Sequence, residues 1–121
     1  MRYLSILSIF ALMLSFGCAS SHEEGVQSSY RTQWTTVNAD TKATTAAAEE
    51  VLKGQGLKNV ESSATKIDGM AMGKMADGTK VHVTINKKGE ASEVSVVVGT
   101  LGDPSLGAEM AKKIKIKAEG M

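Results

Sequence analysis

Aromatic side chains are scarce in this chain of 121 residues, and most of the chain has none. Residues 35–121 contain no phenylalanine, tyrosine or tryptophan, because the five residues of these types are Tyr3, Phe10, Phe16, Tyr30 and Trp34. Proteins that stack on nucleic-acid bases or on sugars need exposed rings. The scarcity of rings therefore argues against base-stacking nucleic-acid binders and sugar-stacking carbohydrate modules.

Cysteine is equally scarce, since Cys18 is the only one. A single thiol excludes an internal disulfide bond and a zinc site built from four cysteines. The sequence also lacks a nucleophile elbow, a phosphate-binding loop and a paired acid motif. We therefore expect one modest domain that is not an enzyme, with no cofactor and no evident small-molecule substrate.

Residues 1–17 have the composition of an export signal. Arg2 supplies the positive charge, and the apolar stretch Leu4–Phe16 is interrupted only by three serines. A membrane-spanning helix needs roughly 20 apolar residues, so this stretch is too short for a permanent anchor. It has the length of the apolar region of a signal peptide.

The end of this segment resembles the lipobox of bacterial lipoproteins, in which a small residue precedes an obligatory cysteine. Gly17 and Cys18 fit that pattern, whereas Ser15 and Phe16 depart from its preferred aliphatic and small residues. The resemblance implies that Cys18 is lipidated: its thiol takes a diacylglyceryl group, the signal is cut before it, and the new amine is acylated. Such acyl chains hold a protein on a membrane. The alternative is ordinary secretion with cleavage after Ala19 or nearby.

The residue after the cysteine and the charge balance bear on location and partners. In lipoproteins of enteric-type bacteria, an aspartate after the cysteine signals inner-membrane retention, so Ala19 predicts the periplasmic face of the outer membrane in a Gram-negative host. Loss of Arg2 with the signal reduces the 14 Lys and Arg residues to 13, against 13 Asp and Glu residues. A formally neutral domain is not expected to bind nucleic acid through its net charge.

Residues 18–36 are rich in serine, threonine and glutamine and show little apolar periodicity. This composition predicts a lipid anchor followed by a flexible tether, with the folded domain at residues 37–121. Tyr30 and Trp34 are the only large side chains of the tether. They either dock on the domain or lie at the level of the lipid headgroups.

Within the domain, small apolar side chains at four-residue spacing over residues 38–53 predict a helix. A period of two follows and predicts four strands, over residues 57–67, 70–76, 81–86 and 93–99. Asp77-Gly78 is a strong signal for a hairpin between the second and third of these strands. The short turns between successive strands predict an antiparallel meander.

The last element has the clearest boundaries. Asp103 can cap a helix, and Pro104 suits the first helical position, where its missing N–H costs nothing. Leu106, Met110 and Ile114 then form an apolar stripe at four-residue spacing. The order helix, four strands, helix predicts an α+β two-layer sandwich, in which a four-stranded antiparallel meander carries both helices on one face.

The stretch from Asp68 to Ile114 resembles an uncharacterised family of small bacterial lipoproteins. The matching segments are ADGTKVHV at residues 76–83 and VSVVVGTLGD at residues 94–103. Val97 stands at a position where that family often has arginine. The resemblance implies the α+β fold and a location in the cell envelope, and no activity comes with it.

Three methionines lie close together and allow a copper interpretation. Met70 and Met72 share one face of a predicted strand, Met75 points to the other, and His82 on the next strand can approach them. Thioethers are soft ligands that select Cu(I). Methionine also fills irregular gaps in a core without rings, and this packing role is the simpler interpretation.

Two further groups of polar residues are weaker candidates. The lysines of the final helix either contact anionic lipid headgroups or form a solvated face. His22 lies in the tether without a partner histidine at metal-ligand spacing.

The sequence as a whole predicts a membrane-anchored periplasmic lipoprotein that acts as a structural or protein-interaction module of the envelope. Copper binding by Met70, Met72 and His82 is the alternative.

Overall fold

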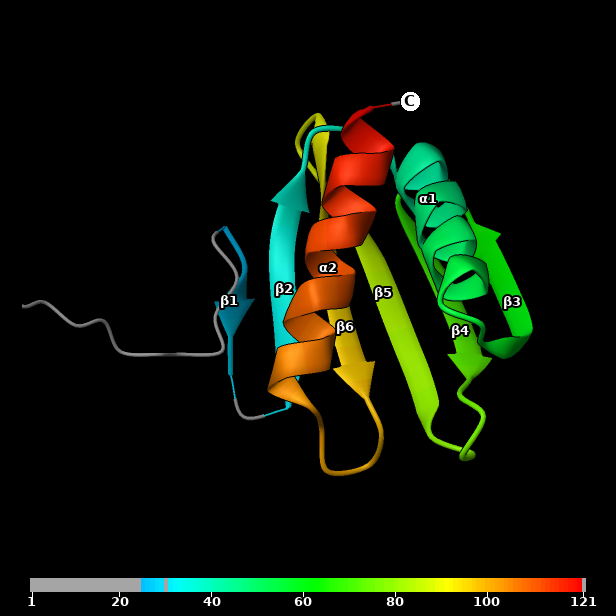
Figure 1. Ribbon diagram of the computed structural model, residues 1–121. Helices are drawn as coiled ribbons and strands as arrows, with labels where there is room; N and C mark the ends of the chain where they lie inside the picture. Colours follow the sequence, from blue (N-terminus) through cyan, green and yellow to red (C-terminus); the bar gives the residue numbers. More distant parts are fainter. Residues whose placement is uncertain (1–24, 30, 121) are drawn as a thin grey trace, which may run out of the picture.

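Two helices and one six-stranded sheet make up the described part of the computed structural model, which comprises residues 25–29 and 31–120 (Figure 1). The helices are α1 (Thr41–Gly54) and α2 (Pro104–Glu119). The strands are β1 (Gln27–Ser28), β2 (Thr32–Val37), β3 (Lys58–Ala64), β4 (Asp68–Lys74), β5 (Lys80–Lys88) and β6 (Ala91–Val98). The chain is thus an α+β protein, as the sequence predicts.

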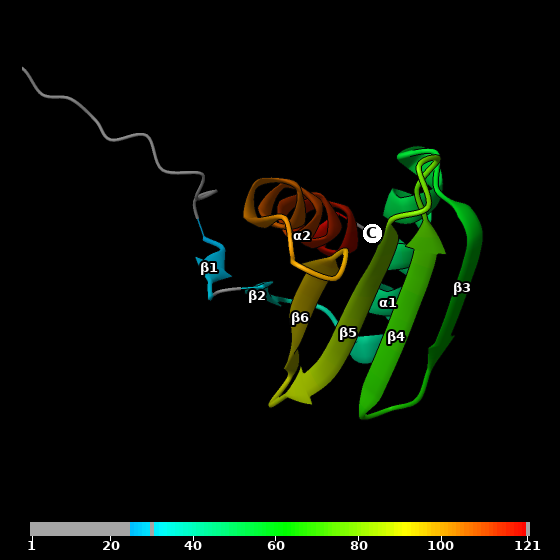
Figure 2. The same cartoon turned by 90° about the horizontal axis from the view of Figure 1, so that it is seen from below.

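The sheet is antiparallel throughout, with the strand order β1-β2-β6-β5-β4-β3. Strands β1 and β3 form its two edges (Figure 2). Helix α1 carries the chain from β2 across to β3, and the chain then returns strand by strand until β6 pairs with β2. The predicted architecture, a four-stranded meander between two helices, is therefore wrong, because the chain enters the sheet before α1.

Strand β1 and all of β2 except Val37 come from residues 18–36, which the sequence predicted to be anchor and tether. Strand β2 turns Gln33 and Thr35 inward, and both are buried although they are polar. The Gln33 side-chain amide donates to the Ser28 hydroxyl over 2.7 Å, and the Thr35 hydroxyl donates to the Gly25 carbonyl over 2.7 Å. These hydrogen bonds satisfy the Thr35 hydroxyl and the N–H of the Gln33 amide, whereas the Gln33 side-chain oxygen is buried without a partner in the described residues. Because these inward positions are polar, β2 lacks the apolar alternation that normally identifies a strand.

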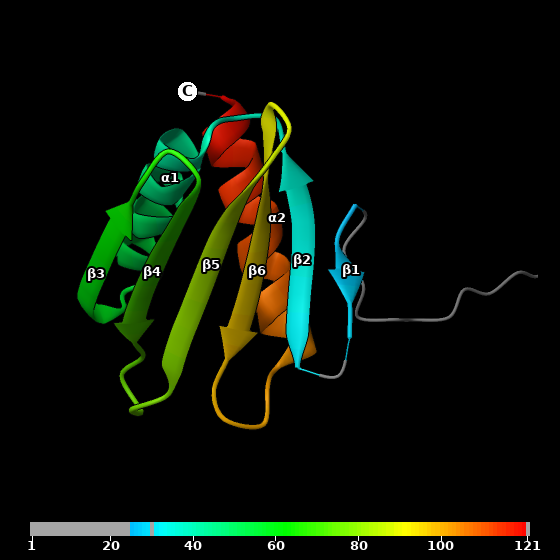
Figure 3. The ribbon, with the colours of Figure 1, turned by 180° about the vertical axis from the view of Figure 1, so that it is seen from behind.

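Both helices lie on the same side of the sheet, and no helix of the described chain covers the opposite side (Figure 1, Figure 3). Helix α1 packs mainly on β3 and β4, whereas α2 packs on β2 and β6, and the helices also contact each other. The core between the two layers is aliphatic. Its largest fully buried apolar side chains include Leu52, Ile85, Met110 and Ile114.

Small residues allow α1 to lie close to the sheet. Strand β4 turns Gly69, Ala71 and Gly73 inward. A Cβ atom at Gly69 would overlap the hydroxyl of Thr45 in α1, and one at Gly73 would come within 3.1 Å of the Leu57 side chain. The helix therefore packs where the strand presents almost no side-chain volume.

The last turns of α2 cover the outer edge of β2 beyond the short β1. The Lys115 ammonium group donates to the Thr36 carbonyl over 2.9 Å, and the Glu119 carboxylate accepts the Asn38 N–H over 2.9 Å. Hydrogen bonds from the Asn38 N–H, and then from Lys115, lower the pKa of Glu119. Unpaired edge groups invite pairing with another chain, so these contacts protect this edge of the sheet.

Candidate functional site

The face of the sheet without helices, called here the open face, carries the three residues that the sequence proposed as copper ligands. Met70 and Met72 alternate on β4 with small buried residues, and His82 alternates on β5 with buried valines. Met70 and Met72 are half-buried on the open face, and His82 is exposed there. Met75 lies just beyond β4 and packs partly buried against the core. Met75 therefore packs against the core, whereas Met70 and Met72 are half-buried on the other side of the sheet.

The strand register brings Met72 and His82 together. Met72 is directly opposite His82 on β5 and directly opposite Glu61 on β3. Met70 lies two residues earlier on β4, opposite Thr84. Directly opposite residues on one face of a sheet have Cβ atoms about 5 Å apart. Two of the three proposed ligands are therefore neighbours, and the third lies beside them on the same face.

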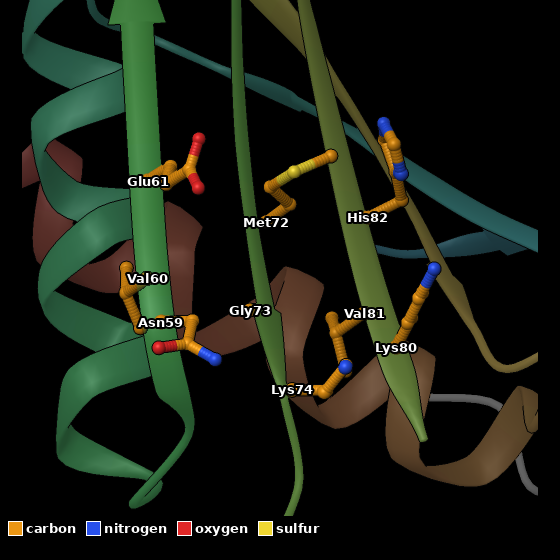
Figure 4. Close-up of a pocket in the computed structure, with 9 residues that line it drawn as sticks. All are labelled: Asn59, Val60, Glu61, Met72, Gly73, Lys74, Lys80, Val81 and His82. Atoms are coloured by element: carbon orange, nitrogen blue, oxygen red, sulfur yellow. The ribbon is translucent and has the colours of Figure 1, made fainter. Parts of the chain in front are cut away.

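A groove of about 430 Å³ crosses strands β3, β4 and β5 at this position (Figure 4). Figure 4 shows Glu61, Met72 and His82 projecting from three neighbouring strands, with Met72 reaching toward β5. The groove is lined by Asn59, Val60, Glu61, Met72, Gly73, Lys74, Lys80, Val81 and His82. Its walls thus combine a thioether, an imidazole and a carboxylate with two ammonium groups.

A metal held only by histidine, cysteine or carboxylate groups has no site in the described residues, because no three such side chains come together there. A metal on the open face would depend on thioether sulfur, which favours Cu(I) over Mg²⁺ or Ca²⁺. Cys18 and His22 lie outside the described residues, as does Tyr30. Trp34 is part of β2 and half-buried on the open face.

Three lysines of α2 have acidic partners. Lys113 pairs with Glu109 over 3.0 Å, Lys115 pairs with Glu119 over 2.8 Å, and Lys117 lies 3.6 Å from Glu50 of α1. Exposed pairs of this kind contribute about 1 kcal/mol or less to stability. They do, however, neutralise much of the positive charge of the helix, which favours the solvated-face interpretation over contact with anionic lipid.

Sequence reasoning missed the position of Glu61 and a row formed by Lys58, Lys74 and Lys80. The predicted hairpin carries a signal for part of this row, because the register of a hairpin places Lys74 opposite Lys80. The register between β3 and β4 shifts between Lys58 and Glu61, next to Asn59 with a φ of 54°. The alternation of apolar and polar residues in the sequence does not reveal such a bulge. The residues on the β3 side of the groove could therefore be identified only from the structure.

The fold defines a small α+β protein with one helix-covered and one open sheet face, an architecture that does not by itself specify an activity. The chain belongs to the family described as "Protein of unknown function (DUF3568)", which it matches over residues 2–117. No curated protein matches the chain. Among the described residues, neither helix is long and apolar enough to cross a membrane. Family membership confirms the expectation of an uncharacterised family.

Proposed function

We propose that this chain is a lipid-anchored protein of the bacterial envelope, held by Cys18 on the periplasmic face of the outer membrane. The support is the position of the only cysteine, directly after Gly17 and at the end of a short apolar segment with a positive start. Acyl chains on Cys18 provide stable attachment without a spanning helix. The residue after the cysteine is Ala19 and not an aspartate, which favours the outer membrane over the inner one.

In this location the domain acts as a protein-interaction module rather than as an enzyme, and the open face is its binding surface. The observation that carries this proposal is a sheet face that no helix of the described chain covers. Half-buried apolar side chains, those of Trp34, Met70, Met72 and Val97, flank the exposed polar residues His82 and Thr84 of the central strand β5. Lys58, Lys74 and Lys80 lie at one end of the strands, and Asp68, Glu93 and its partner Lys88 lie at the other. A face that combines apolar and polar side chains with a charged rim fits a protein partner.

Site-specific photo-crosslinking in living cells tests this assignment. A crosslinker at Thr84, an exposed position at the centre of the open face, is expected to yield a discrete adduct with an envelope protein. The matched control is Glu109, which is equally exposed on α2 and belongs to the opposite layer. The proposal fails if Thr84 yields no protein adduct, or if both positions yield the same adducts.

Copper binding is a second candidate function, favoured by the direct pairing of Met72 with His82 and by Met70 on the same face. Two thioethers and one imidazole form a soft ligand set for Cu(I). The groove at Met72 is open to solvent, so an ion can enter without unfolding the sheet. In this role the protein binds or carries copper in the envelope.

Competition with a chromogenic Cu(I) chelator tests the copper function. Replacing Met70 or Met72 by leucine, or His82 by glutamine, is expected to weaken Cu(I) binding at least about tenfold, since even residues that only support metal ligands contribute this much. Met75→Leu is the matched control, because Met75 lies off the open face against the core. If wild-type protein binds Cu(I) no more tightly than a variant with both Met70 and Met72 replaced, the copper function is excluded.

A further inference from the structure

A row of like charges crosses one end of the open face. Lys58, Lys74 and Lys80 are exposed and stand directly opposite one another on β3, β4 and β5. Like charges in this position destabilise a sheet. Within residues 25–29 and 31–120, none of the three forms an ion pair, whereas Lys53 and Lys88 pair with glutamates. The repulsion between these lysines therefore destabilises the sheet, and no ion pair in the described residues offsets it.

The open face is hollowed beside this row, where β5 meets the end of β6 and the start of β2. The hollow has a volume of about 730 Å³. Three basic side chains and three hydroxyl groups line it, those of Arg31, Lys80, His82, Thr79, Thr84 and Thr100. The loop between β6 and α2 fixes the backbone of Arg31, because a Cβ atom at Gly102 would come within 2.9 Å of the Arg31 Cα atom. Cations from two separate chain segments thus share one cavity.

One acidic side chain offsets part of this charge. Asp77 is the one acid among the described residues that line the hollow. Its carboxylate accepts the N–H of Thr79 over 2.9 Å, and hydrogen bonds from the Thr79 side chain and then its N–H lower the pKa of Asp77. Asp77 is therefore ionised and held within its own turn, where it offsets one of the two positive charges of Arg31 and Lys80. Arg31 makes no ion pair in the described part of the chain.

We propose that this hollow is a binding site for a phosphate group. Arginine matches the geometry of a phosphate through its planar fork, and lysine adds a point charge. The Thr84 and Thr100 hydroxyls can donate to further oxygens, which a phosphate has and a carboxylate lacks, whereas the Thr79 hydroxyl already bonds to Asp77. The volume of the hollow exceeds that of a phosphate alone, so it leaves room for the molecule that carries the group.

Two sources offer this chemistry, a phospholipid headgroup at the membrane surface and a soluble phosphate ester. The site itself does not depend on the lipid anchor or on the protein partner of the proposed function. Its failure would therefore leave the crosslinking result at Thr84 unaffected. The experiment needs one arm for each source of phosphate.

Nuclear magnetic resonance of the full-length chain in a nonionic maltoside detergent provides both arms. In the first, sodium phosphate is titrated against sodium chloride at equal ionic strength. In the second, phosphatidic acid is added to the micelles and compared with diacylglycerol, which lacks only the phosphate. Saturable changes in the chemical shifts of the Lys80, Thr84 and Thr100 amides in the first arm support a site open to soluble phosphates. Shifts confined to the second arm support a headgroup site. Absence of shifts in both arms overturns the proposal.

Charge variants separate a specific site from general attraction of anions. Arg31→Gln and Lys80→Gln are each expected to weaken phosphate binding roughly two- to fivefold, the range for a single exposed charge contact. Lys66→Gln is the matched control, because Lys66 is exposed, makes no ion pair in the described residues and lies in the β3–β4 turn outside the hollow. If Lys66→Gln weakens phosphate binding equally, the anion is attracted by the overall charge and not by a specific site, which would overturn the proposal.

Discussion

Replacing Ile114 by alanine is expected to lower the free energy of unfolding by about 2 to 5 kcal/mol. Ile114 is 0% exposed on the inner side of α2, in a core that contains no aromatic ring. Its removal leaves a cavity that neighbouring aliphatic side chains fill only in part. Because small domains are stable by about 5 to 15 kcal/mol, the loss is a large share of the total. Urea unfolding followed by the fluorescence of Trp34, the only tryptophan, measures it.

Ile116 provides the matched control in the same helix. It has the same side chain as Ile114 but is 62% exposed, because two residues along a helix turn the side chain to the other side. Ile116→Ala is expected to change the free energy of unfolding by no more than about 0.5 kcal/mol. Equal destabilisation by both variants would contradict the orientation of α2 on the sheet.

Gly69→Ala is expected to lower the free energy of unfolding by about 1 to 3 kcal/mol, even though it adds a single methyl group. The added Cβ would overlap the Thr45 hydroxyl and lie 3.4 Å from the Ala64 Cβ. Thr45 is held in place, since its hydroxyl donates to the Thr41 carbonyl over 2.7 Å. Helix α1 must therefore move away from β4, or Thr45 must give up this hydrogen bond. Urea unfolding measures the change.

Two further variants identify the source of that cost. Gly54→Ala is the matched control, because nothing lies within 4 Å of a Cβ there, and alanine favours a helix over glycine by up to about 1 kcal/mol. Thr45→Ala removes the overlapping hydroxyl, so the cost of Gly69→Ala is expected to fall in that background. Additive losses in the double variant would show that α1 and β4 do not approach each other at this point.

The elements with strong local signals could be predicted from the sequence. Helix α2 begins at Pro104, and Asp103 caps it by accepting the Leu106 N–H over 3.1 Å, as the residue types predict. Strand β5 shows the expected alternation of buried valines and isoleucine with exposed polar residues. In both cases the residues that determine the structure are neighbours in the sequence. Local propensity and burial agree, so no tertiary information is needed.

Strand β2 could not be predicted in the same way. Its inward positions include Gln33 and Thr35, whose burial depends on hydrogen bonds to Ser28 and Gly25. The polar composition that predicted a tether is therefore the composition of a strand with polar partners. This is why the sheet has six strands where four were expected.

The candidate site was predictable only in part. The sequence placed Met70, Met72 and His82 on neighbouring strands, and the register confirms that they share one face. Glu61 and Lys58 depend on a bulge in β3, and Arg31 depends on the missed β2. Strand order rather than sequence spacing determines which residues these three meet on the open face, so alternation does not identify them.

The intact mass of the protein extracted from membranes tests the central claim, attachment through Cys18, most directly. The proposal predicts the mass of residues 18–121 plus a diacylglyceryl group on the thiol and one acyl chain on the new amine. Cys18→Ser is expected to leave the chain without lipid. An unmodified mature chain that begins after Ala19, with the wild-type protein released from membranes, would contradict the proposal.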